Sequence, residues 1–172
     1  MQHSAYLSLG SNLGDRAANL RTALNGLRSF GVLQAVSSFY ETAPVENTDQ
    51  PMFINCAAEL HTSLAPLDLL QAVLTIERSM GRVRGDGSAT KGPRIIDIDI
   101  LLIDGLVLDT PELTLPHPAI QARRFVLAPL VEIAPEICHP ILKQNVREML
   151  EALHENEGKV CRLSMGDGTG NR

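Results

Sequence analysis

The chain has 172 residues, a formal net charge of −5 and an apolar fraction of 44%. This length fits a single domain with a sizeable core, and no apolar run approaches the length that spans a bilayer. The acidic balance gives no general attraction for nucleic acid or a membrane surface, so neither is expected as a partner. Cys56, Cys138 and Cys161 lack metal-site spacing, and the N-terminal residues show no secretory signal pattern. We therefore expect a cytoplasmic protein, and a monomer.

Hydrophobic periodicity predicts strands and helices along the first part of the chain. Residues 5–10 (AYLSLG) have the composition of a strand, and Ser11, Asn12 and Asp15 follow with side chains that suit helix capping. A helix is expected next, ending near Gly31. Further elements are expected at 32–42 (strand), 53–62 (strand), 66–81 (helix) and 97–104 (strand). This order predicts an α+β protein with a ferredoxin-like β-α-β-β-α-β antiparallel sheet, helices on one face and the other face open.

The C-terminal part of the sequence predicts smaller additions to this sheet. A short strand or hairpin is expected from Val107, followed by the segment PHPAIQARRF and a helix near 142–156. The final residues, SMGDGTGNR, are polar and rich in glycine, which is typical of disorder. The sequence thus predicts one domain over residues 1–158 and a flexible tail over 159–172.

Two carboxylates interrupt the apolar strand within GPRIIDIDILLID. Alternation along a strand places Asp97 and Asp99 on one face, roughly 7 Å apart, where two like charges need a positive neighbour. One interpretation is an edge strand with solvated carboxylates. The other is a divalent cation, Mg²⁺, which prefers oxygen ligands and combines carboxylates with substrate phosphates. In that case we expect Arg94 to face a phosphate rather than the acid pair.

A basic segment precedes the two acids. From residue 78 to residue 94 the sequence has four arginines and Lys91 against the single acid Asp86. Arginine suits phosphate binding because its planar fork pairs two oxygens and stays charged, and no Walker-type glycine loop is present. Glycines flank Arg82 and Arg84, which favours a loop that closes over a bound polyphosphate. A solvated basic loop is the alternative.

His117, between two prolines, and Arg123 form a second polar cluster. The prolines stiffen the backbone, which favours a positioned histidine, although a purely structural histidine is the alternative. Phe53, at the start of a strand, and Phe125, after a basic pair, are candidates for the walls of a site for a flat heterocycle. Core packing is the alternative for both rings.

Five separated parts of the sequence resemble one known family. They are SLGSNLGDR, YETAPV with DQPMFIN, IERSMGRVR, GPRIIDIDILLID and LPHPAIQARRFVLAPL, in this order. Together they are similar to the 6-hydroxymethyl-7,8-dihydropterin pyrophosphokinases of folate biosynthesis, from residue 4 to residue 138. The resemblance implies a catalytic domain whose substrates are ATP and a reduced pterin. It implies transfer of the β,γ-pyrophosphoryl group of ATP to the hydroxymethyl oxygen of the pterin, with release of AMP.

The resemblance also implies site residues by motif position. Asp97 and Asp99 would hold two Mg²⁺ ions, and the catalytic set would comprise these acids with Arg82, Arg84 and Arg94. The implied ATP contacts are Leu70, Glu77, Arg82, Arg84, Arg94, Ile100, Thr114, His117 and Arg123. The implied pterin pocket is Thr42, Ala43, Val45, Phe53, Asn55 and Phe125, with the ring stacked between the two phenylalanines. An asparagine both donates and accepts hydrogen bonds, as the amide edge of a pterin requires.

Two other classes of protein fit parts of this pattern. A metal-dependent glycosyltransferase would use the Asp-x-Asp string to hold a nucleotide diphosphate, but it requires a Rossmann-type alternation that the predicted strand order lacks. An RNA-binding module on a ferredoxin-like sheet requires aromatic and basic residues on its strands. Here two aspartates stand on the strand instead and repel phosphate unless a metal intervenes. Both classes are therefore less favoured than the pyrophosphokinase.

Overall fold

The computed structural model describes residues 1–44, 49–82, 92–155 and 158–164. The strands are β1 (His3–Ser11), β2 (Val32–Val36), β3 (Tyr40–Thr42), β4 (Phe53–Thr62), β5 (Asp97–Ile103), β6 (Leu108–Asp109), β7 (Thr114–Leu115) and β8 (Val160–Arg162); the helices are α1 (Arg16–Leu27), α2 (Pro66–Ser79), α3 (Arg124–Ile133) and α4 (Val146–Ala152), with a 3-10 turn at Ile120–Ala122. The main sheet has the order β5-β1-β4-β3-β8, with β2 also paired to β4, and β6 and β7 form a separate ribbon. The strand pairings of this sheet are antiparallel, as the sequence predicts.

Three of the helices begin at a start signal in the sequence, which is a capping side chain for α1 and α4 and a proline for α2. The side chain of Asp15 accepts a hydrogen bond from the main-chain N–H of Ala18 (3.0 Å) and so caps α1. Pro66 occupies the first turn of α2, where its missing N–H leaves no helical bond unmade. A capping box formed by Asn145 and Glu148 starts α4. These contacts confirm two of the expected helix starts.

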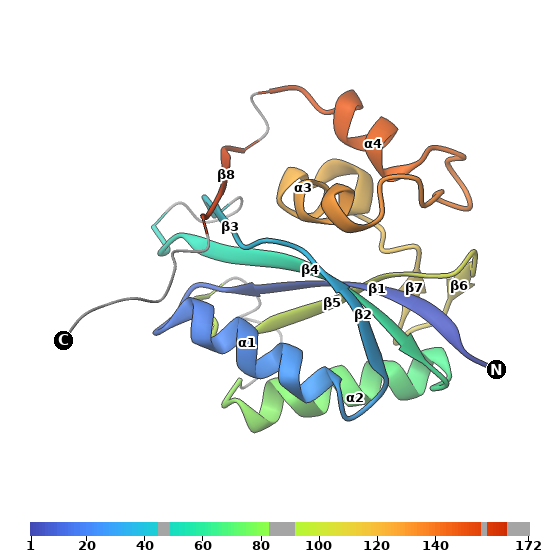
Figure 1. The fold of residues 1–172 in the computed structure, drawn as a ribbon, viewed down its shortest axis with the longest axis horizontal. Coiled ribbons are helices and arrows are strands. Elements are labelled where there is room, and N and C mark those ends of the chain that lie inside the picture. The colour runs from blue at the N-terminus through green and yellow to red at the C-terminus, as the bar shows by residue number, and fades with distance from the viewer. Residues whose placement is uncertain (45–48, 83–91, 156–157, 165–172) are drawn as a thin grey trace.

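The larger core lies between the sheet and the helices α1 and α2, which cover one face (Figure 1). Leu20 and Leu27 of α1 pack with Leu69 and Val73 of α2 against strand residues such as Leu7. Fully burying a leucine is favourable by roughly 1.5 to 3 kcal/mol relative to exposure, so this layer is a major source of stability. Each of the two helices therefore buries one side against the sheet.

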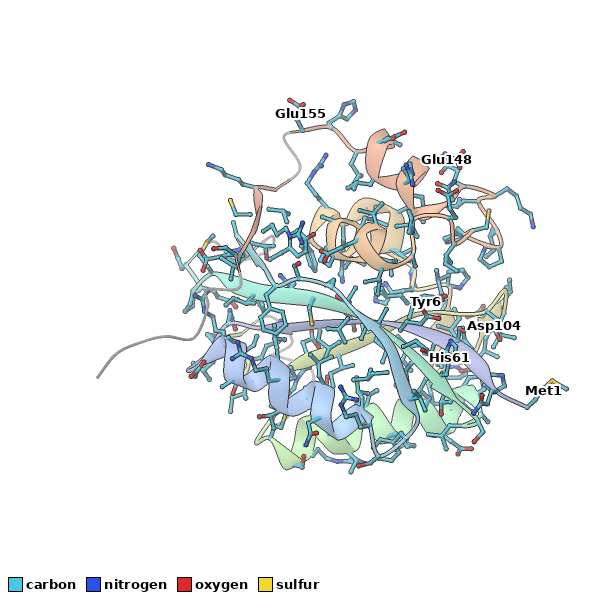
Figure 2. The ribbon with its side chains drawn as sticks, in the orientation of Figure 1. Met1, Tyr6, His61, Asp104, Glu148 and Glu155 are labelled. Carbon is cyan, nitrogen blue, oxygen red and sulfur yellow. The ribbon has the colours of Figure 1, made fainter. Side chains whose placement is uncertain are left out.

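The opposite face of the sheet is not open, which corrects the expectation of helices on one face only. Helix α3 crosses it with α4 packed above (Figure 1). Val126 and Leu130 of α3 and Met149 of α4 pack with Tyr6 and Leu102 from the sheet. Figure 2 shows Tyr6 on this side of the sheet. The physical reason is that the segment from residue 124 is too apolar to remain exposed, so it folds as a helix and covers this face.

Other elements differ from expectation at their ends. The strand expected over 32–42 is two strands, β2 and β3, and α4 is shorter than the expected helix at 142–156. Residues 160–162 form β8, which pairs with β3, so regular structure continues past the boundary expected at residue 158. In the part of the chain that the structure describes, no helix has the length and apolar character needed to cross a membrane.

Candidate functional site

Two halves of a site meet on the face of the sheet that carries α3. Ile54 and Ile98 pack into the core beneath α1 and α2, so their neighbours Asn55 and Asp97 point to the opposite face. Gly10 of β1 pairs with Asn55 on one side and with Asp97 on the other. Paired Cα atoms in an antiparallel sheet are about 5 Å apart, which puts Asn55 and Asp97 roughly 10 Å apart. A Cβ atom at position 10 would lie 2.5 Å from Oδ1 of Asn55, so the two halves are joined by a position that needs glycine.

Asp97 is bound by two arginines. Nη1 of Arg82 donates to Oδ1, and Nη1 of Arg94 donates to Oδ2 over 2.9 Å. Burial by itself would raise the pKa of Asp97, but the guanidinium charges of Arg82 and Arg94 prevail and lower it. The carboxylate is therefore ionised at neutral pH. Arg94 therefore contacts Asp97 here, because a buried carboxylate recruits the nearest cations. That Arg94 faces a phosphate when a nucleotide and Mg²⁺ are bound stays a prediction.

Asp99 is less well compensated. Its ion-pair contact among the described residues is with Nη1 of Arg123, 4.0 Å from Oδ2. Burial and the negative charge of Asp97 raise the pKa of Asp99 to about 6. The two carboxylates share one face, the contact of Asp99 with a described cation is long, and hard oxygen donors of this kind suit Mg²⁺. Among the described residues, no group of three or more acidic, histidine or cysteine side chains that could hold a metal occurs.

Glu77 of α2 holds Arg82 in place. It is almost completely buried at the end of α2, with 1% of its surface exposed. Its Oε1 atom accepts from Nη1 of Arg82 (2.8 Å) and from the main-chain N–H of Ile98 (2.8 Å). Nη1 of Arg82 also donates to the carbonyl of Ile96 (3.1 Å). Glu77 thus locks Arg82 against the start of β5. The ATP contact that the resemblance implies for Glu77 stays a prediction.

His117 and Arg123 lie at the other side of Asp99. The main-chain N–H of His117 donates to the carbonyl of Leu101 (2.9 Å), and its Nδ1 atom accepts from the N–H of Ala119 (3.1 Å). Burial and the positive charge of Arg123 lower the pKa of His117. The ring is therefore neutral at pH 7, and because Nδ1 accepts, the proton is on Nε2. Nε2–H is then available as a fixed donor for an anionic oxygen.

The second half of the site contains an amide, a hydroxyl and an aromatic ring. Nδ2 of Asn55 donates to Oγ1 of Thr42 over 2.6 Å, and both residues are buried. Phe53 stands opposite Thr42 in the pairing of β4 with β3. The guanidinium of Arg94 lies over the Phe53 ring, 5.9 Å from its centre. This contact connects the amide half to the half that contains Asp97.

A pocket of about 460 Å³ adjoins Thr42, between β3, the start of α3 and the C-terminal segment. Its lining includes the expected residues Thr42, Ala43, Arg123 and Phe125, and it also includes Pro44, Ala122, Arg124, Gly158, Lys159 and Val160. Three of these residues are cationic and none is acidic, so the pocket favours an anionic or electron-rich ligand. Sequence reasoning missed Arg124, Lys159 and Val160, since the first begins a helix that was not expected and the others lie in the expected tail.

Some expected residues are not joined to this cluster by a described contact. The side chain of Ile100 is buried in the core beneath α1 and α2, so the contact with a nucleotide that the resemblance implies would use its main chain and stays a prediction. Leu70 packs partly against the same core, and Thr114 is exposed on β7 with its hydroxyl 3.4 Å from Oδ1 of Asp109. Arg84 and Val45 lie outside the described residues.

Comparison with known proteins identifies the family. The family model for 7,8-dihydro-6-hydroxymethylpterin-pyrophosphokinase (HPPK) matches residues 6–135. The chain is 44% identical over 151 residues to the 2-amino-4-hydroxy-6-hydroxymethyldihydropteridine pyrophosphokinase of Methylorubrum extorquens, covering 87% of this chain and 92% of that protein. It is 41% identical over 151 residues to the Folic acid synthesis protein fol1 of Schizosaccharomyces pombe, covering 87% of this chain. The chain spans 20% of that longer relative and 22% of a similar one from Dictyostelium discoideum.

Solved structures agree with the fold. A crystal structure of an HPPK-DHPS in complex with substrates matches with a TM-score of 0.68 at 16% identity, over 88% of this chain and 43% of that chain. The A437G form of Plasmodium falciparum HPPK-DHPS with SDX-DHP matches with a TM-score of 0.70 at 18% identity, over 88% and 45%. At these identities the likeness concerns the fold alone. On the family model and the curated relatives, this chain belongs to the 7,8-dihydro-6-hydroxymethylpterin-pyrophosphokinase family.

Proposed function

We propose that this protein transfers the β,γ-pyrophosphoryl group of ATP to the hydroxymethyl oxygen of 6-hydroxymethyl-7,8-dihydropterin, giving AMP and the pterin diphosphate. The observation that carries the proposal is the placement of Asn55 and Asp97 on either side of Gly10. Asn55 can hydrogen-bond to a heterocycle and Asp97 suits a metal–phosphate complex, and the two residues lie on β4 and β5 with only β1 between them. That separation suits a pterin whose hydroxymethyl arm reaches a nucleotide's phosphates.

Asp97 and Asp99 would hold Mg²⁺, with two ions expected when ATP is bound. The long contact of Asp99 with Arg123, its raised pKa and the shared face of the two acids support this assignment. When bound, the ions would offset phosphate charge and lower the pKa of the attacking hydroxyl, so no dedicated base is required. The protein's own task is then to orient the two substrates and to exclude water.

Arg82, Arg94 and Arg123 would bind the phosphate oxygens, together with the Nε2–H donor of His117. Although burial opposes its charge, Asp97 and Glu77 raise the pKa of Arg82, so this guanidinium stays cationic. Its fixed position stabilises charge that develops during transfer without first having to reorganise. Arg84, Leu70, Thr114 and the main chain of Ile100 would complete the nucleotide contacts.

Asn55 and Thr42 would recognise the amide edge of the pterin. An asparagine paired with a hydroxyl presents donor and acceptor groups side by side, which matches the alternating edge of that ring. Phe53 and Phe125 would stack on the ring's two faces, with Ala43 and Val45 at its rim. Arginines over both phenylalanine rings support them, at 5.9 Å for Arg94 and 5.7 Å for Arg123.

We further infer a ferredoxin-like arrangement for the sheet and its first two helices, with additions at the C-terminus. The strand order β5-β1-β4 with β2 on the outer edge of β4, together with α1 and α2 on one face, supports this inference. One catalytic domain over 1–158, a monomeric state and a cytoplasmic location remain predictions from the sequence.

The direct test is to incubate the protein with ATP, Mg²⁺ and 6-hydroxymethyl-7,8-dihydropterin and to separate the nucleotides. We expect AMP in equal amount to the pterin diphosphate, loss of turnover with a chelator, and recovery with added Mg²⁺. Asp97→Asn and Asp99→Asn should each slow turnover by about 100-fold or more, the scale of losing a charge-stabilising group. Glu136→Gln is the matched control, since this exposed acid pairs with Arg147 away from the site and its loss should leave turnover unchanged. Formation of ADP, or no turnover with the wild type, would contradict the proposal.

A further inference from the structure

Asn12 follows β1 and has an environment that the proposed reaction does not explain. The sequence suggests a capping role, but α1 is capped by Asp15. Asn12 is instead buried, with 1% of its surface exposed. A buried carboxamide costs free energy unless its donors and acceptor are satisfied, so its contacts should reveal its role.

The Asn12 side chain joins two segments that are distant in the sequence. Nδ2 donates to Oε1 of Gln50 (3.0 Å) and to the carbonyl of Pro51 (3.3 Å). Oδ1 accepts the main-chain N–H of Arg94 (2.7 Å), and the main-chain N–H of Asn12 donates to the carbonyl of Arg94 (3.1 Å). The main-chain donor and acceptor partners fix the orientation of the amide, since a flipped amide would face Arg94 N–H with a donor.

Each of these segments leads directly into one half of the site. Pro51 is two residues before Phe53, which starts the strand that carries Asn55. Arg94 binds Asp97 through Nη1 over 2.9 Å and covers the Phe53 ring at 5.9 Å. A shift of the main chain at Pro51 therefore reaches Arg94 through one buried amide, and a shift at Arg94 reaches Pro51 by the same route.

We propose that Asn12 is a positioning residue that couples the two substrate sites. A ligand that orders the Phe53 side holds the Pro51 carbonyl in place, and Asn12 then holds the main chain of Arg94 in its binding position. Binding at one site thus reduces the conformational freedom that must be lost at the other, which produces positive cooperativity. By linkage the effect is reciprocal, so a bound nucleotide strengthens pterin binding by the same factor. This inference rests on the proposed function, because it assumes these two ligands.

The test measures the affinity of 6-hydroxymethylpterin by calorimetry, with and without Mg²⁺ and α,β-methylene-ATP. The methylene group replaces the oxygen that must leave, so no pyrophosphoryl transfer occurs. For the wild type we expect the nucleotide to tighten pterin binding by about tenfold, within the usual range for coupled sites. Asn12→Asp keeps the shape and the acceptor for Arg94 but removes the donors to Gln50 and Pro51. The coupling factor is the pterin Kd without nucleotide divided by the pterin Kd with nucleotide. In Asn12→Asp it should fall to about one, while each ligand still binds in the absence of the other.

Gln50→Met is the second variant, since it removes one partner on the pterin side and leaves Asn12 itself intact. It should also reduce the coupling factor, and it tests the proposal independently if Asn12→Asp does not fold. Asn19→Ala is the matched control: Nδ2 of Asn19 binds Ser11 Oγ (3.1 Å) and the Leu13 carbonyl (2.8 Å) in the same turn, but reaches neither segment. Its coupling factor should equal that of the wild type.

The outcomes separate the two proposals. If the wild type binds neither ligand, the proposed function fails. If the wild type binds both without coupling, or if folded Asn12→Asp or Gln50→Met retains the full factor, the function stands and the role of Asn12 is refuted. A loss of coupling in Asn19→Ala as large as that in Asn12→Asp would also refute it, because general disturbance of the turn would then suffice.

Discussion

At the scale of single residues, Asp97 and Asp99 have the same chemistry but different surroundings. Asp97 accepts from two arginines, whereas Asp99 lies near the negative charge of Asp97 with Arg123 4.0 Å away. In metal-free protein, the first carboxylate therefore stabilises the fold through ion pairs. The second one carries a charge that burial and repulsion disfavour.

This difference predicts opposite effects on stability. In the presence of a chelator, Asp97→Asn should reduce the free energy of unfolding by roughly 2 to 3 kcal/mol, because two partly buried arginines lose their carboxylate. Asp99→Asn should leave that free energy unchanged or slightly higher, although both variants lose turnover. Urea unfolding followed by circular dichroism measures both values. Equal destabilisation by the two substitutions would show that their surroundings do not differ as described.

Gly10 provides a second prediction at this scale. Gly10→Ala introduces a Cβ atom 2.5 Å from Oδ1 of Asn55, so the amide must turn away from its position beside Thr42. We expect the KM for the pterin to rise about tenfold or more, as expected for a displaced buried hydrogen-bonding group, with a smaller change in the KM for ATP. Gly105→Ala is the control, since no atom lies within 4 Å of the added carbon. If both variants show wild-type kinetics, Gly10 has no role in leaving room for the Asn55 amide beside Thr42.

At the scale of elements, a polar cluster connects α3 to the edge of the sheet. Glu132 of α3 accepts hydrogen bonds from the hydroxyl of Tyr40 (2.6 Å) and from the N–H (2.9 Å) and hydroxyl (2.8 Å) of Ser38. Arg162 of β8 donates to the Ser38 hydroxyl (3.0 Å). The cluster joins three elements that surround the pocket, so it stabilises the position of Phe125 relative to Thr42.

The hydrogen bond between Tyr40 and Glu132 predicts a pH dependence. Burial would raise the pKa of Glu132, but the hydrogen bonds from Tyr40 and Ser38 prevail and lower it. The hydrogen-bonded carboxylate therefore stabilises the fold at pH values above the pKa of Glu132 in the unfolded chain. That stabilisation is lost as the pH falls through the pKa of Glu132 in the folded protein. Burial and Glu132 raise the pKa of Tyr40 from 10.0 to about 12, so stabilisation is also lost as pH rises through that range. Tyr40→Phe should cost about 1 to 2 kcal/mol at neutral pH and less at both extremes. Urea unfolding at a series of pH values checks this, and a constant difference from the wild type would contradict it.

The elements also show where sequence patterns succeed. Helices α1 and α2 were predictable because a start signal, Asp15 for α1 and Pro66 for α2, and apolar residues at helical spacing point to the same answer. Helix α3 was not, because no side chain caps its start, Pro129 lies inside it, and its apolar residues surround it on most sides. A segment of that kind forms a helix through tertiary packing, in this case against the sheet, which local patterns do not reveal.

At the scale of the whole molecule, the sequence predicts which residues form the candidate site, but it does not predict their contacts. The alternation rule placed Asp97 and Asp99 on one face, and the resemblance supplied Asn55 and Thr42. The buried anchor Glu77 brings Arg82 to β5 only after α2 packs on the sheet, which is a long-range event. Likewise, Lys159 reaches the pocket because β8 returns to pair with β3, far from it in the sequence.

The position of β5 at the end of the main sheet has one more consequence. A strand at such an edge is a template on which another chain can add, and the apolar composition of β5 would favour this. Two copies joined along that edge would bring four carboxylates from Asp97 and Asp99 close together. We therefore expect the acids proposed to bind the cation to oppose such an addition as well, so that replacing both with neutral residues would remove this protection together with the chemistry.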